Sequence, residues 1–225
     1  MKEVLVIGGG FAGVRSAAGA VRAAREAGGD VHVTLVSTGD DLVVRPRLCE
    51  QDPASKRVSL DGVLGPIGVR RVTATVTAID TDAHTVRAVD RSGEEVELGY
   101  DTLVLAAGSR LVRPNFPGVQ YVFDIDTLPA AAAFDHHLRR PPQRMSSAGR
   151  YTAVVVGAGF TGLEISTALG ERLRTIADTH DAGGEVRVIL VDRADVIGPE
   201  LGEGPRPNID EAVDELKIER RRGRR

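Results

Sequence analysis

The sequence predicts an α/β fold with two β-α-β units of the three-layer ββα type and an inserted antiparallel β-meander. Two observations support this expectation. Residues 4–13 and 153–162 are each a run of apolar, mostly β-branched residues that ends in Gly-x-Gly-x-x-Gly and passes into an Ala-rich segment with helical spacing. Between the two copies the hydrophobic period changes to two, which is typical of antiparallel strands. The similarity of the copies indicates an internal duplication.

The first unit follows the order strand, helix, strand. Residues 14–27 predict a helix that packs small alanine side chains on the sheet, and the pair Gly28-Gly29 ends it. Residues 31–36 predict the second strand. The two strands are expected to be parallel because a helix connects them as a right-handed crossover.

The meander follows this unit. Residues 37–53 are polar and predict a loop or short helix at the carboxyl ends of the strands, where ligands of open α/β sheets bind. Strand-like segments at 72–79, 84–89 and 94–98 predict the meander. Residues 102–109 then indicate a further buried parallel strand that ends in a Gly-Ser turn.

The second unit lies in the C-terminal half of the chain. Residues 128–139 predict a helix, and the second glycine motif precedes a longer helix from 163 to about 177 and a strand at 186–191. A short helix is expected to begin at Asn208, a good N-cap residue with Glu211 three positions on. We predict four segments: 1–112 as a first nucleotide-binding domain with the meander at 72–98, 113–150 as linker and helix, 151–219 as a truncated second nucleotide-binding domain, and 220–225 as a basic tail.

Composition and charge narrow the class of protein. A hydrophobic content of 42% and a charged content of 27% are ordinary for a soluble globular protein, and a net charge of −3 provides no overall attraction to nucleic acid. No apolar run approaches the roughly 18 to 20 residues of a membrane span, and the strand that starts at Val4 leaves no room for a signal peptide. We therefore expect a soluble, cytoplasmic protein without a nucleic-acid partner.

Several enzyme classes are disfavoured by the residues present. Cys49 is the single cysteine, which excludes an internal disulfide, a Cys-x-x-Cys redox pair and a zinc knuckle. The pair His136-His137 lies on a predicted surface helix, and no metal site is expected. No carboxylate pair or Ser–His–Asp set supports a hydrolytic mechanism.

Each glycine motif predicts a Rossmann-like dinucleotide site. The first glycine makes the tight turn out of the strand, the second lets the backbone approach a pyrophosphate, and the third lets the helix pack closely on the strand. The helix N-terminus offers free N–H groups and partial positive charge to the phosphates. Two such sites on one chain suggest chemistry that passes from one dinucleotide to the other. The glycines are Gly8, Gly10 and Gly13 in the first motif and Gly157, Gly159 and Gly162 in the second.

The order of these features resembles a known family. The first glycine motif, the meander, the segment Tyr100–Ser109 and a second glycine motif that extends to Glu164 follow one another as in the two-dinucleotide-binding flavoproteins of the pyridine nucleotide–disulfide reductase superfamily. The chain is most similar to the type II NADH dehydrogenase-like and apoptosis-inducing-factor-like branch, from Met1 to about Leu216. The resemblance implies FAD at the first motif, NAD(P)H at the second, and hydride transfer from nicotinamide to flavin.

The resemblance also implies roles for individual residues. Glu164 would lie near the nicotinamide–flavin junction as the candidate catalytic residue. Arg45 and Pro46 would lie along FAD near the isoalloxazine, and the backbone of Val76 would contact its adenine end. Besides the six glycines, the implied cofactor-binding residues are Phe11, Ala12, Ser37, Ala107 and Gly108 for FAD, and Phe160, Thr161 and Asp192 for NAD(P)H.

The residues at the ends of the second strands differ between the two units. A FAD site normally carries an acidic residue there, but the first unit has Ser37, and Asp40 or Asp41 are the candidate substitutes. The second unit has Asp192, which favours NADH over NADPH because a carboxylate repels a 2′-phosphate. The neighbouring Arg193 acts in the opposite direction.

Two further features of the family are missing from this chain. The redox pair Cys-x4-Cys is absent, and Cys49 is interpreted as a small, partly buried residue. The C-terminal part of the family fold returns to the FAD domain and carries dimer or quinone contacts. That part is absent here, so the chain is interpreted as the N-terminal portion of such a protein.

We therefore predict a FAD-dependent NAD(P)H oxidoreductase that passes hydride from NADH to FAD and on to a quinone or another small-molecule acceptor. For full-length members the resemblance implies peripheral membrane contact and homodimers. The alternative is a truncated, catalytically incompetent fragment that retains nucleotide binding only. A plain NAD-dependent dehydrogenase is disfavoured by the meander and by the lack of a catalytic His or Tyr set.

Overall fold

The computed structural model describes residues 2–113, 115–140, 149–179, 185–194, 196–198 and 201–222. Contacts within the chain divide it into two compact units, one of residues 1–44 and 56–114 and the other of residues 45–55 and 115–225. The segment 45–55 therefore packs with the second unit, a grouping that the sequence pattern does not predict.

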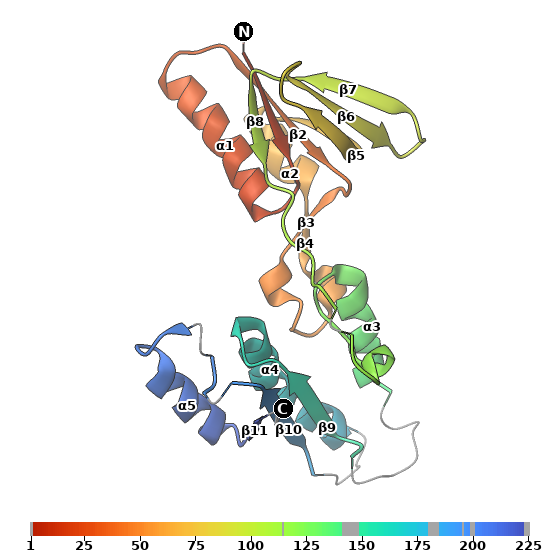
Figure 1. Cartoon of the computed structure of the whole chain (residues 1–225), viewed down its shortest axis with the longest axis vertical. Coiled ribbons are helices and arrows are strands. Elements are labelled where there is room, and N and C mark those ends of the chain that lie inside the picture. The colour runs from red at the N-terminus through yellow and green to blue at the C-terminus, as the bar shows by residue number, and fades with distance from the viewer. Residues whose placement is uncertain are drawn as a thin grey trace. The chain divides into compact units, whose positions relative to one another are not determined.

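The first unit is built on a sheet of six strands: β1 (Lys2–Ile7), β2 (Val31–Ser37), β5 (Arg70–Asp80), β6 (Thr85–Asp90), β7 (Glu95–Gly99) and β8 (Thr102–Leu105). Their order is β7-β6-β5-β2-β1-β8 (Figure 1). β1 lies parallel to β2 and β8, and β2 pairs in parallel with the first part of β5. β5 continues into an antiparallel meander with β6 and β7, which confirms the predicted meander.

Successive side chains of a strand point to opposite faces, and both faces of β1 and β2 are covered. On one face Val6 packs against the helices α1 (Phe11–Glu26) and α2 (Leu60–Leu64). On the other face Leu5 packs in a cluster with Val86 of the meander. The layers of meander, sheet and helix confirm the predicted three-layer ββα arrangement.

Short elements occupy the connections. The segment 37–53, expected as a loop or short helix, contains a short strand and a helical turn. The short elements are β3 (Asp41–Val43), which pairs antiparallel with β4 (Arg57–Ser59), and the 3-10 turns η1 (Arg45–Arg47), η2 (Pro53–Ser55), η3 (Gly65–Ile67) and η4 (Val119–Tyr121).

The strand β8 is shorter and more exposed than the sequence predicts. A buried strand was expected at 102–109, but β8 ends at Leu105, which is 65% exposed. Among the strands that the structure describes, β8 pairs with β1 alone. The expectation of a buried strand is therefore wrong, because a strand with one neighbour leaves an edge and part of its apolar surface open.

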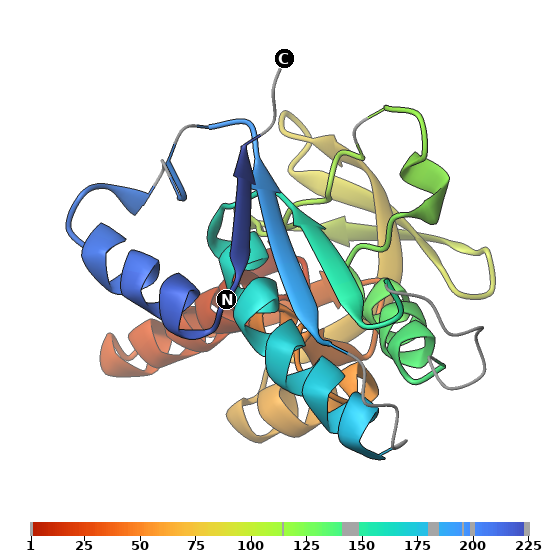
Figure 2. The same cartoon turned by 90° about the horizontal axis from the view of Figure 1, so that it is seen from below.

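The second unit contains a parallel sheet with the order β11-β10-β9 (Figure 2). It confirms the second predicted β-α-β unit, since α4 connects β9 to β10. Leu173 of α4, Leu190 of β10 and Val213 of α5 are buried in one core. The elements are α3 (Leu128–Leu138), β9 (Thr152–Val156), α4 (Phe160–Thr179), β10 (Arg187–Asp192), α5 (Arg206–Glu215) and β11 (Glu219–Arg222).

Two elements near the C-terminus differ from what the sequence predicts. Residues 220–222, assigned to a basic tail, belong to β11 and pair with β10, while residues 223–225 lie outside the described residues. The helix α5 begins at Arg206 after Pro205, and Asn208 is not its N-cap. Pro207 accounts for the earlier start, because its fixed φ suits the first turn of a helix, where its missing N–H has no partner to lose.

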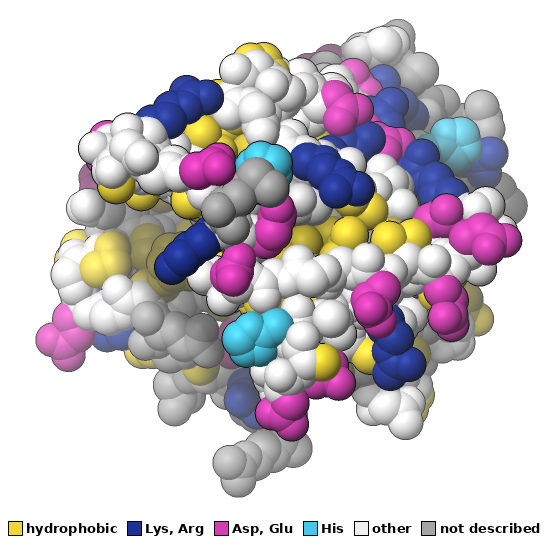
Figure 3. All heavy atoms as spheres, turned by 90° about the horizontal axis from the view of Figure 1, so that it is seen from above, with side chains coloured by type: hydrophobic (Ala, Val, Ile, Leu, Met, Phe, Trp, Pro, Cys, Tyr) yellow, Lys and Arg dark blue, Asp and Glu magenta, His cyan; other side chains and the backbone are white. Residues whose placement is uncertain are grey.

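Charged side chains of both signs are interspersed on the face shown in Figure 3. This mixture is what a net charge of −3 on a chain with 27% charged residues predicts. In the part of the chain that the structure describes, no helix has both the length and the hydrophobicity needed to cross a bilayer.

A buried ion pair ties the segment 45–55 to two helices of the second unit. The Arg172 side chain on α4 is 7% exposed, and it donates to the Asp135 carboxylate of α3 at 2.5 Å and to the backbone carbonyl of Cys49 at 2.8 Å. Burial lowers the pKa of Arg172, and the charge of Asp135 opposes that shift. Asp135 also accepts a hydrogen bond from the exposed Arg139 at 2.8 Å.

Replacing Arg172 by methionine should destabilise the second unit. The change leaves the Asp135 carboxylate and the Cys49 carbonyl without their buried donor, so we expect the free energy of unfolding to fall by about 3 kcal/mol. Arg139→Ala, which removes the exposed partner of the same carboxylate, should cost less than about 1 kcal/mol. Urea unfolding followed by circular dichroism measures both, and equal losses in the two variants would contradict the structural role of Arg172.

Candidate dinucleotide-binding sites

The first glycine turn follows β1 and has no room for side chains at two positions. Gly8 has a φ of +117°, and a Cβ added there would lie 2.1 Å from the carbonyl oxygen of Ala106. A Cβ added at Gly13 would lie 1.8 Å from the carbonyl oxygen of Gly8. Glycine is required at both positions, because any other residue would strain the backbone or collide with it. The first glycine therefore turns the chain, and the third seats α1 against the turn.

The second glycine turn repeats this geometry. Gly157 has a φ of +104°, and a Cβ added at Gly162 would lie 1.8 Å from the carbonyl oxygen of Gly157. The backbone N–H of Gly8 donates to the carbonyl of Val36, and that of Gly157 donates to the carbonyl of Val191, both at 2.8 Å. The two β-α-β units thus use the same contacts to join strand, turn and helix.

The middle glycine of each motif faces open space. A Cβ added at Gly10 or Gly159 would meet no atom within 4 Å. Gly10 caps α1 without a side-chain hydrogen bond, and neither α1 nor α4 has an acidic residue in its first turn. The helix N–H groups and the positive end of the helix dipole can therefore receive an anion, which fits a pyrophosphate. The predicted neighbours Phe11, Ala12, Phe160 and Thr161 are exposed on the first turns of the two helices.

Ser37 ends β2, but its hydroxyl group forms a hydrogen bond with the backbone of the following loop. The residue is 8% exposed, and its Oγ donates to the carbonyl of Gly39 at 2.8 Å. Both aspartates that were candidate substitutes form ion pairs. Asp40 pairs with Arg71 and Arg91, while Asp41 pairs with Arg57 at 3.2 Å.

Asp192 ends β10, and two backbone N–H groups fix its carboxylate. Ala158 donates to Oδ2 at 2.5 Å, and Ala194 donates to Oδ1 at 2.8 Å. The hydrogen bond from Ala158 lowers the pKa of Asp192 most, and the bond from Ala194 lowers it further. The exposed Arg193 acts in the same direction. The carboxylate is therefore ionised at neutral pH, which is the state that discriminates against a 2′-phosphate.

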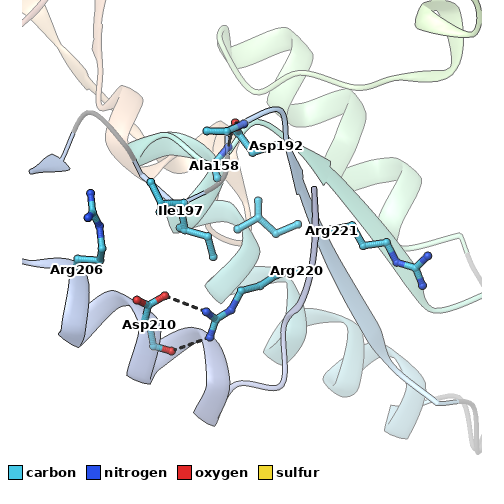
Figure 4. Close-up of a pocket in the computed structure, with 10 residues that line it drawn as sticks. Ala158, Asp192, Ile197, Arg206, Asp210, Arg220 and Arg221 are labelled. Carbon is cyan, nitrogen blue, oxygen red and sulfur yellow. Dashed lines mark hydrogen bonds and ion pairs between the residues drawn. The ribbon is translucent and has the colours of Figure 1, made fainter. Parts of the chain in front are cut away.

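A pocket of about 340 Å³ opens beside Asp192 (Figure 4). Leu190, Val196 and Ile197 give it apolar lining. Away from Asp192, the pocket is bounded by Asp210 of α5, which accepts a hydrogen bond from Arg220 of β11 at 2.9 Å (Figure 4). An apolar lining next to a fixed carboxylate suits an adenosine, whose base needs apolar contacts and whose ribose hydroxyls need an acceptor.

The remaining FAD residues predicted on the first unit lie close to its glycine turn or on β5. Ala107 and Gly108 are exposed directly after β8, and Gly108 has a φ of +77°. The backbone nitrogen of Ala107 lies 3.3 Å from a Cβ added at Gly8, so this segment adjoins the turn. Val76 is half-buried on β5, and the pairing register between β5 and β6 shifts just after it, between Val76 and Ala78. Contact of these residues with FAD stays a prediction.

The residues predicted near the flavin belong to the second unit. Arg45 and Pro46 lie in η1, and Arg45 pairs with Asp126. Glu164 is exposed on α4, beyond the first turn of the helix. Burial raises the pKa of Cys49, and the charge of Glu164 raises it further, so Glu164 lies near the segment 45–55. Cys49 is 9% exposed, which confirms that it is a small buried residue, and the flavin roles of the others stay predictions.

The charged residues around each site were not predicted from the sequence. Asp210 and Arg220 bound the pocket of the second unit, and Arg71 and Arg91 surround the end of β2 in the first. These residues lie far from the glycine motifs in the sequence, and hydrophobic periodicity does not report which charges pair. The one available signal was the place of Arg71 near the start of a predicted strand, since a strand that follows a β-α-β unit is expected beside it.

Metal ligands do not gather in the described ranges of the chain, where no group of three or more His, Cys, Asp and Glu side chains could hold an ion. His137 instead lies against Phe123, with ring centroids 4.4 Å apart. His136 is the residue before it on α3.

Comparison with known proteins identifies relatives for the whole chain. The profile of the pyridine nucleotide-disulphide oxidoreductase family matches residues 2–225. An NADH dehydrogenase-like protein of Mycobacterium tuberculosis is 39% identical over 227 residues, which cover 99% of this chain and 56% of the relative. A type II NADH:quinone oxidoreductase of the same species is 29% identical, over 89% of this chain and 45% of the relative. The chain thus spans about half the length of these relatives.

The fold also matches solved structures. The structure of NDH2 from Plasmodium falciparum in complex with NADH superposes with a TM-score of 0.77 at 16% identity, over 97% of this chain and 47% of the other. Identity this low supports the fold alone. The superposition agrees with the two β-α-β units and the three-layer first unit described above.

Alanine substitutions at the third and middle glycines of the second motif should affect different properties: the first should lower stability, and the second should weaken NADH binding. Gly162→Ala places a methyl group against the Gly157 carbonyl, so we expect the free energy of unfolding to fall by about 3 kcal/mol. Gly159→Ala meets no protein atom, so stability should change by less than about 1 kcal/mol, while the methyl group hinders the approach of a pyrophosphate. Urea unfolding and titration with NADH measure the two effects. A Gly159→Ala variant that binds NADH as wild type does would contradict the site.

Proposed function

Since this chain belongs to the pyridine nucleotide-disulphide oxidoreductase family, we propose that it is a FAD-dependent NADH oxidoreductase of the NADH dehydrogenase-like type. FAD binds the first unit, and NADH binds the second. The observation that carries the proposal is the repeated glycine turn, in which the first glycine has a positive φ, the third has no room for a Cβ beside the carbonyl of the first, and the middle glycine faces open space. One chain with two such turns is suited to hold a donor and an acceptor dinucleotide.

The protein's part in this function is binding and orientation. FAD supplies the redox chemistry, because its flavin accepts a hydride and releases electrons to a further acceptor. The N–H groups at the start of α1 and α4 receive the two pyrophosphates, and the pocket beside Asp192 receives the adenosine of NADH. Ala107 and Gly108 border the first turn, where their small size leaves space for a ring system.

The choice of NADH over NADPH rests on Asp192. Its carboxylate is held toward the pocket by the N–H groups of Ala158 and Ala194, and the same bonds keep it ionised. An ionised carboxylate accepts hydrogen bonds from the 2′- and 3′-hydroxyls of a ribose and repels a 2′-phosphate. Arg193 is exposed beside it and weakens that repulsion without replacing the carboxylate.

A quinone is the acceptor that we propose for the reduced flavin. Support comes from the relatives, since one of them is a type II NADH:quinone oxidoreductase that covers 89% of this chain. That relative is about twice as long as the matched part, so the acceptor site of the whole protein is a proposal by analogy.

A nucleotide-binding chain without turnover is the second candidate. The observation in its favour is apolar surface left open on the sheets: Leu105 of β8 is 65% exposed, and Val154 and Val156 of β9 are 58% and 65% exposed. Open sheet edges and faces normally receive further structure. Binding without hydride transfer would be expected if that structure is needed to align the two nucleotides.

Reconstitution with FAD should distinguish these functions. We expect the purified chain, incubated with FAD and freed of excess, to show a flavin spectrum that bleaches when NADH is added anaerobically. A stable flavin spectrum together with NADH binding would favour the second candidate. A chain that takes up no FAD would overturn the proposed function.

Asp192→Asn should shift the preference between the nicotinamide cofactors. Loss of the negative charge removes repulsion of the 2′-phosphate, so we expect the ratio of NADPH to NADH affinity to rise by about tenfold, or ~1.4 kcal/mol. Since the hydrogen bonds lower the pKa of Asp192 and a phosphate monoester has its second pKa at about 6, the wild-type preference should stay constant from about pH 7.5 to about pH 9, where both groups are fully ionised. Arg193→Ala is the matched variant and should lower the ratio. Fluorescence titration with each cofactor measures both effects, and an unchanged ratio in Asp192→Asn would contradict the assignment.

A further inference from the structure

We propose that Asp40, held by Arg71 and Arg91, is the carboxylate that binds the adenosine ribose in the first dinucleotide site. The inference rests on the proposed function, because it takes FAD as the ligand of the first unit. It replaces Ser37, the residue at the end of β2, with a side chain three positions further along the chain.

Ser37 is poorly placed to serve as the ribose acceptor. A dinucleotide site of this fold normally has an acidic side chain at the end of β2, where its oxygens accept the ribose hydroxyls. Ser37 is 8% exposed and donates its hydroxyl proton to the Gly39 carbonyl at 2.8 Å. It therefore offers a neutral, nearly buried oxygen in place of an exposed carboxylate. The first unit needs another acceptor at this corner.

Asp40 lies at the same corner as Ser37 and the glycine turn. Ser37 pairs with Thr73 in the register of β2 and β5, and the Thr73 hydroxyl lies 3.3 Å from Oδ1 of Asp40. The backbone carbonyl of Asp40 accepts a hydrogen bond from the N–H of Leu60 at 2.9 Å. Leu60 in turn reaches the glycine turn, since its Cδ1 lies 2.8 Å from a Cβ added at Gly9. The Asp40 carboxylate is thus offset from the end of β2, where the acid is expected, by about the spacing of two neighbouring strands.

Two arginines fix the carboxylate while leaving it accessible. Arg71 donates to Oδ1 of Asp40 at 2.9 Å, and Arg91 donates to Oδ2 at 2.6 Å. The Asp40 side chain remains 45% exposed. A carboxylate has about four acceptor positions, and the two arginines and Thr73 use three of them, so one remains for a ribose hydroxyl. The hydrogen bond from Arg91, followed by that from Arg71, lowers the pKa of Asp40, so the group is an anion at neutral pH.

The two other aspartates nearby, Asp61 and Asp41, each form an ion pair of their own with an arginine. Asp61 uses both oxygens in a bidentate pair with Arg71, at 2.6 Å to Nε and 3.0 Å to the terminal nitrogen. Asp41 lies on β3 and pairs with Arg57 at 3.2 Å. Asp61 also anchors Arg71, whose side chain is 14% exposed, and this fixes the arginine that holds Asp40.

The charge balance of this group favours a ribose without a phosphate. Arg71 and Arg91 carry two positive charges, and Asp40 and Asp61 carry two negative charges, so the group is formally neutral. A 2′-phosphate would meet the exposed Asp40 carboxylate and two arginines that are already paired. The unphosphorylated ribose of an adenine dinucleotide such as FAD meets an acceptor instead.

Titration with FAD and FMN tests the assignment, because FMN has the flavin and one phosphate but lacks the adenosine. Asp40→Asn should weaken FAD binding to the whole chain by about tenfold and leave the FMN affinity unchanged. Asp40→Glu, which keeps the charge, should recover part of the loss. Asp41→Asn, at the neighbouring ion pair, should bind FAD as wild type does. Thermal unfolding of each variant checks that the fold persists.

Three results would overturn the assignment. FAD bound equally by wild type and Asp40→Asn would show that the ribose has another partner. If Asp40→Asn lost affinity for FAD and FMN equally, the substitution would have a general effect on the first unit. The same would follow if Asp40→Asn and Asp41→Asn lost equal affinity for FAD. In each of these cases the proposed function stands, whereas a wild-type chain that takes up no FAD overturns the proposed function and this assignment together.

Discussion

The close contact between the first and third glycines of each motif is the constraint on which both candidate sites depend. A Cβ at the third glycine would lie 1.8 Å from the carbonyl oxygen of the first, in both units. That contact allows the helix to start directly against the strand, and it leaves the N–H groups of the first turn facing outward beside a glycine with open space. A shift of the helix by the width of a methyl group would move these N–H groups away from the turn. The anion site is therefore a consequence of backbone packing and not of any charged side chain.

The two units share this scaffold and differ in how they treat the end of the second strand. In the second unit the acid is Asp192, and backbone N–H groups from the glycine turn and the following loop hold it. In the first unit the same place is taken by the nearly buried Ser37, and the exposed carboxylate hydrogen-bonded to the neighbouring Thr73 is that of Asp40, which arginine side chains hold. Backbone donors fix a carboxylate with few degrees of freedom, while an arginine pair fixes it through long side chains. The duplicated unit has thus retained its turn and changed the means of orienting its acidic group.

The sequence predicts what depends on local pattern and misses what depends on pairing across the fold. The β-α-β units and the meander follow from runs of apolar residues, their period and the glycine turns, so their existence could be predicted. The exposure of Leu105 depends on whether β8 has a second neighbour, and the strand at 219–222 lies in an arginine-rich stretch that reads as a solvated tail. Asp40 pairs with Arg91, which is 51 residues away in the sequence, and no periodicity connects them. Charge partners of this kind become visible only when the strand register is known.

Binding and turnover are separable properties of such a chain. Each unit has its own core and its own glycine turn, so each candidate pyrophosphate cradle is formed by the residues of one unit. Hydride transfer makes a stricter demand, because it requires two bound molecules to meet at reacting distance and in a fixed orientation. The open apolar surface at Val154 and Val156 belongs to β9, the strand that leads directly into the second glycine turn. The turn itself is formed by backbone contacts within its unit, so binding of the dinucleotide and its alignment for hydride transfer depend on different contacts.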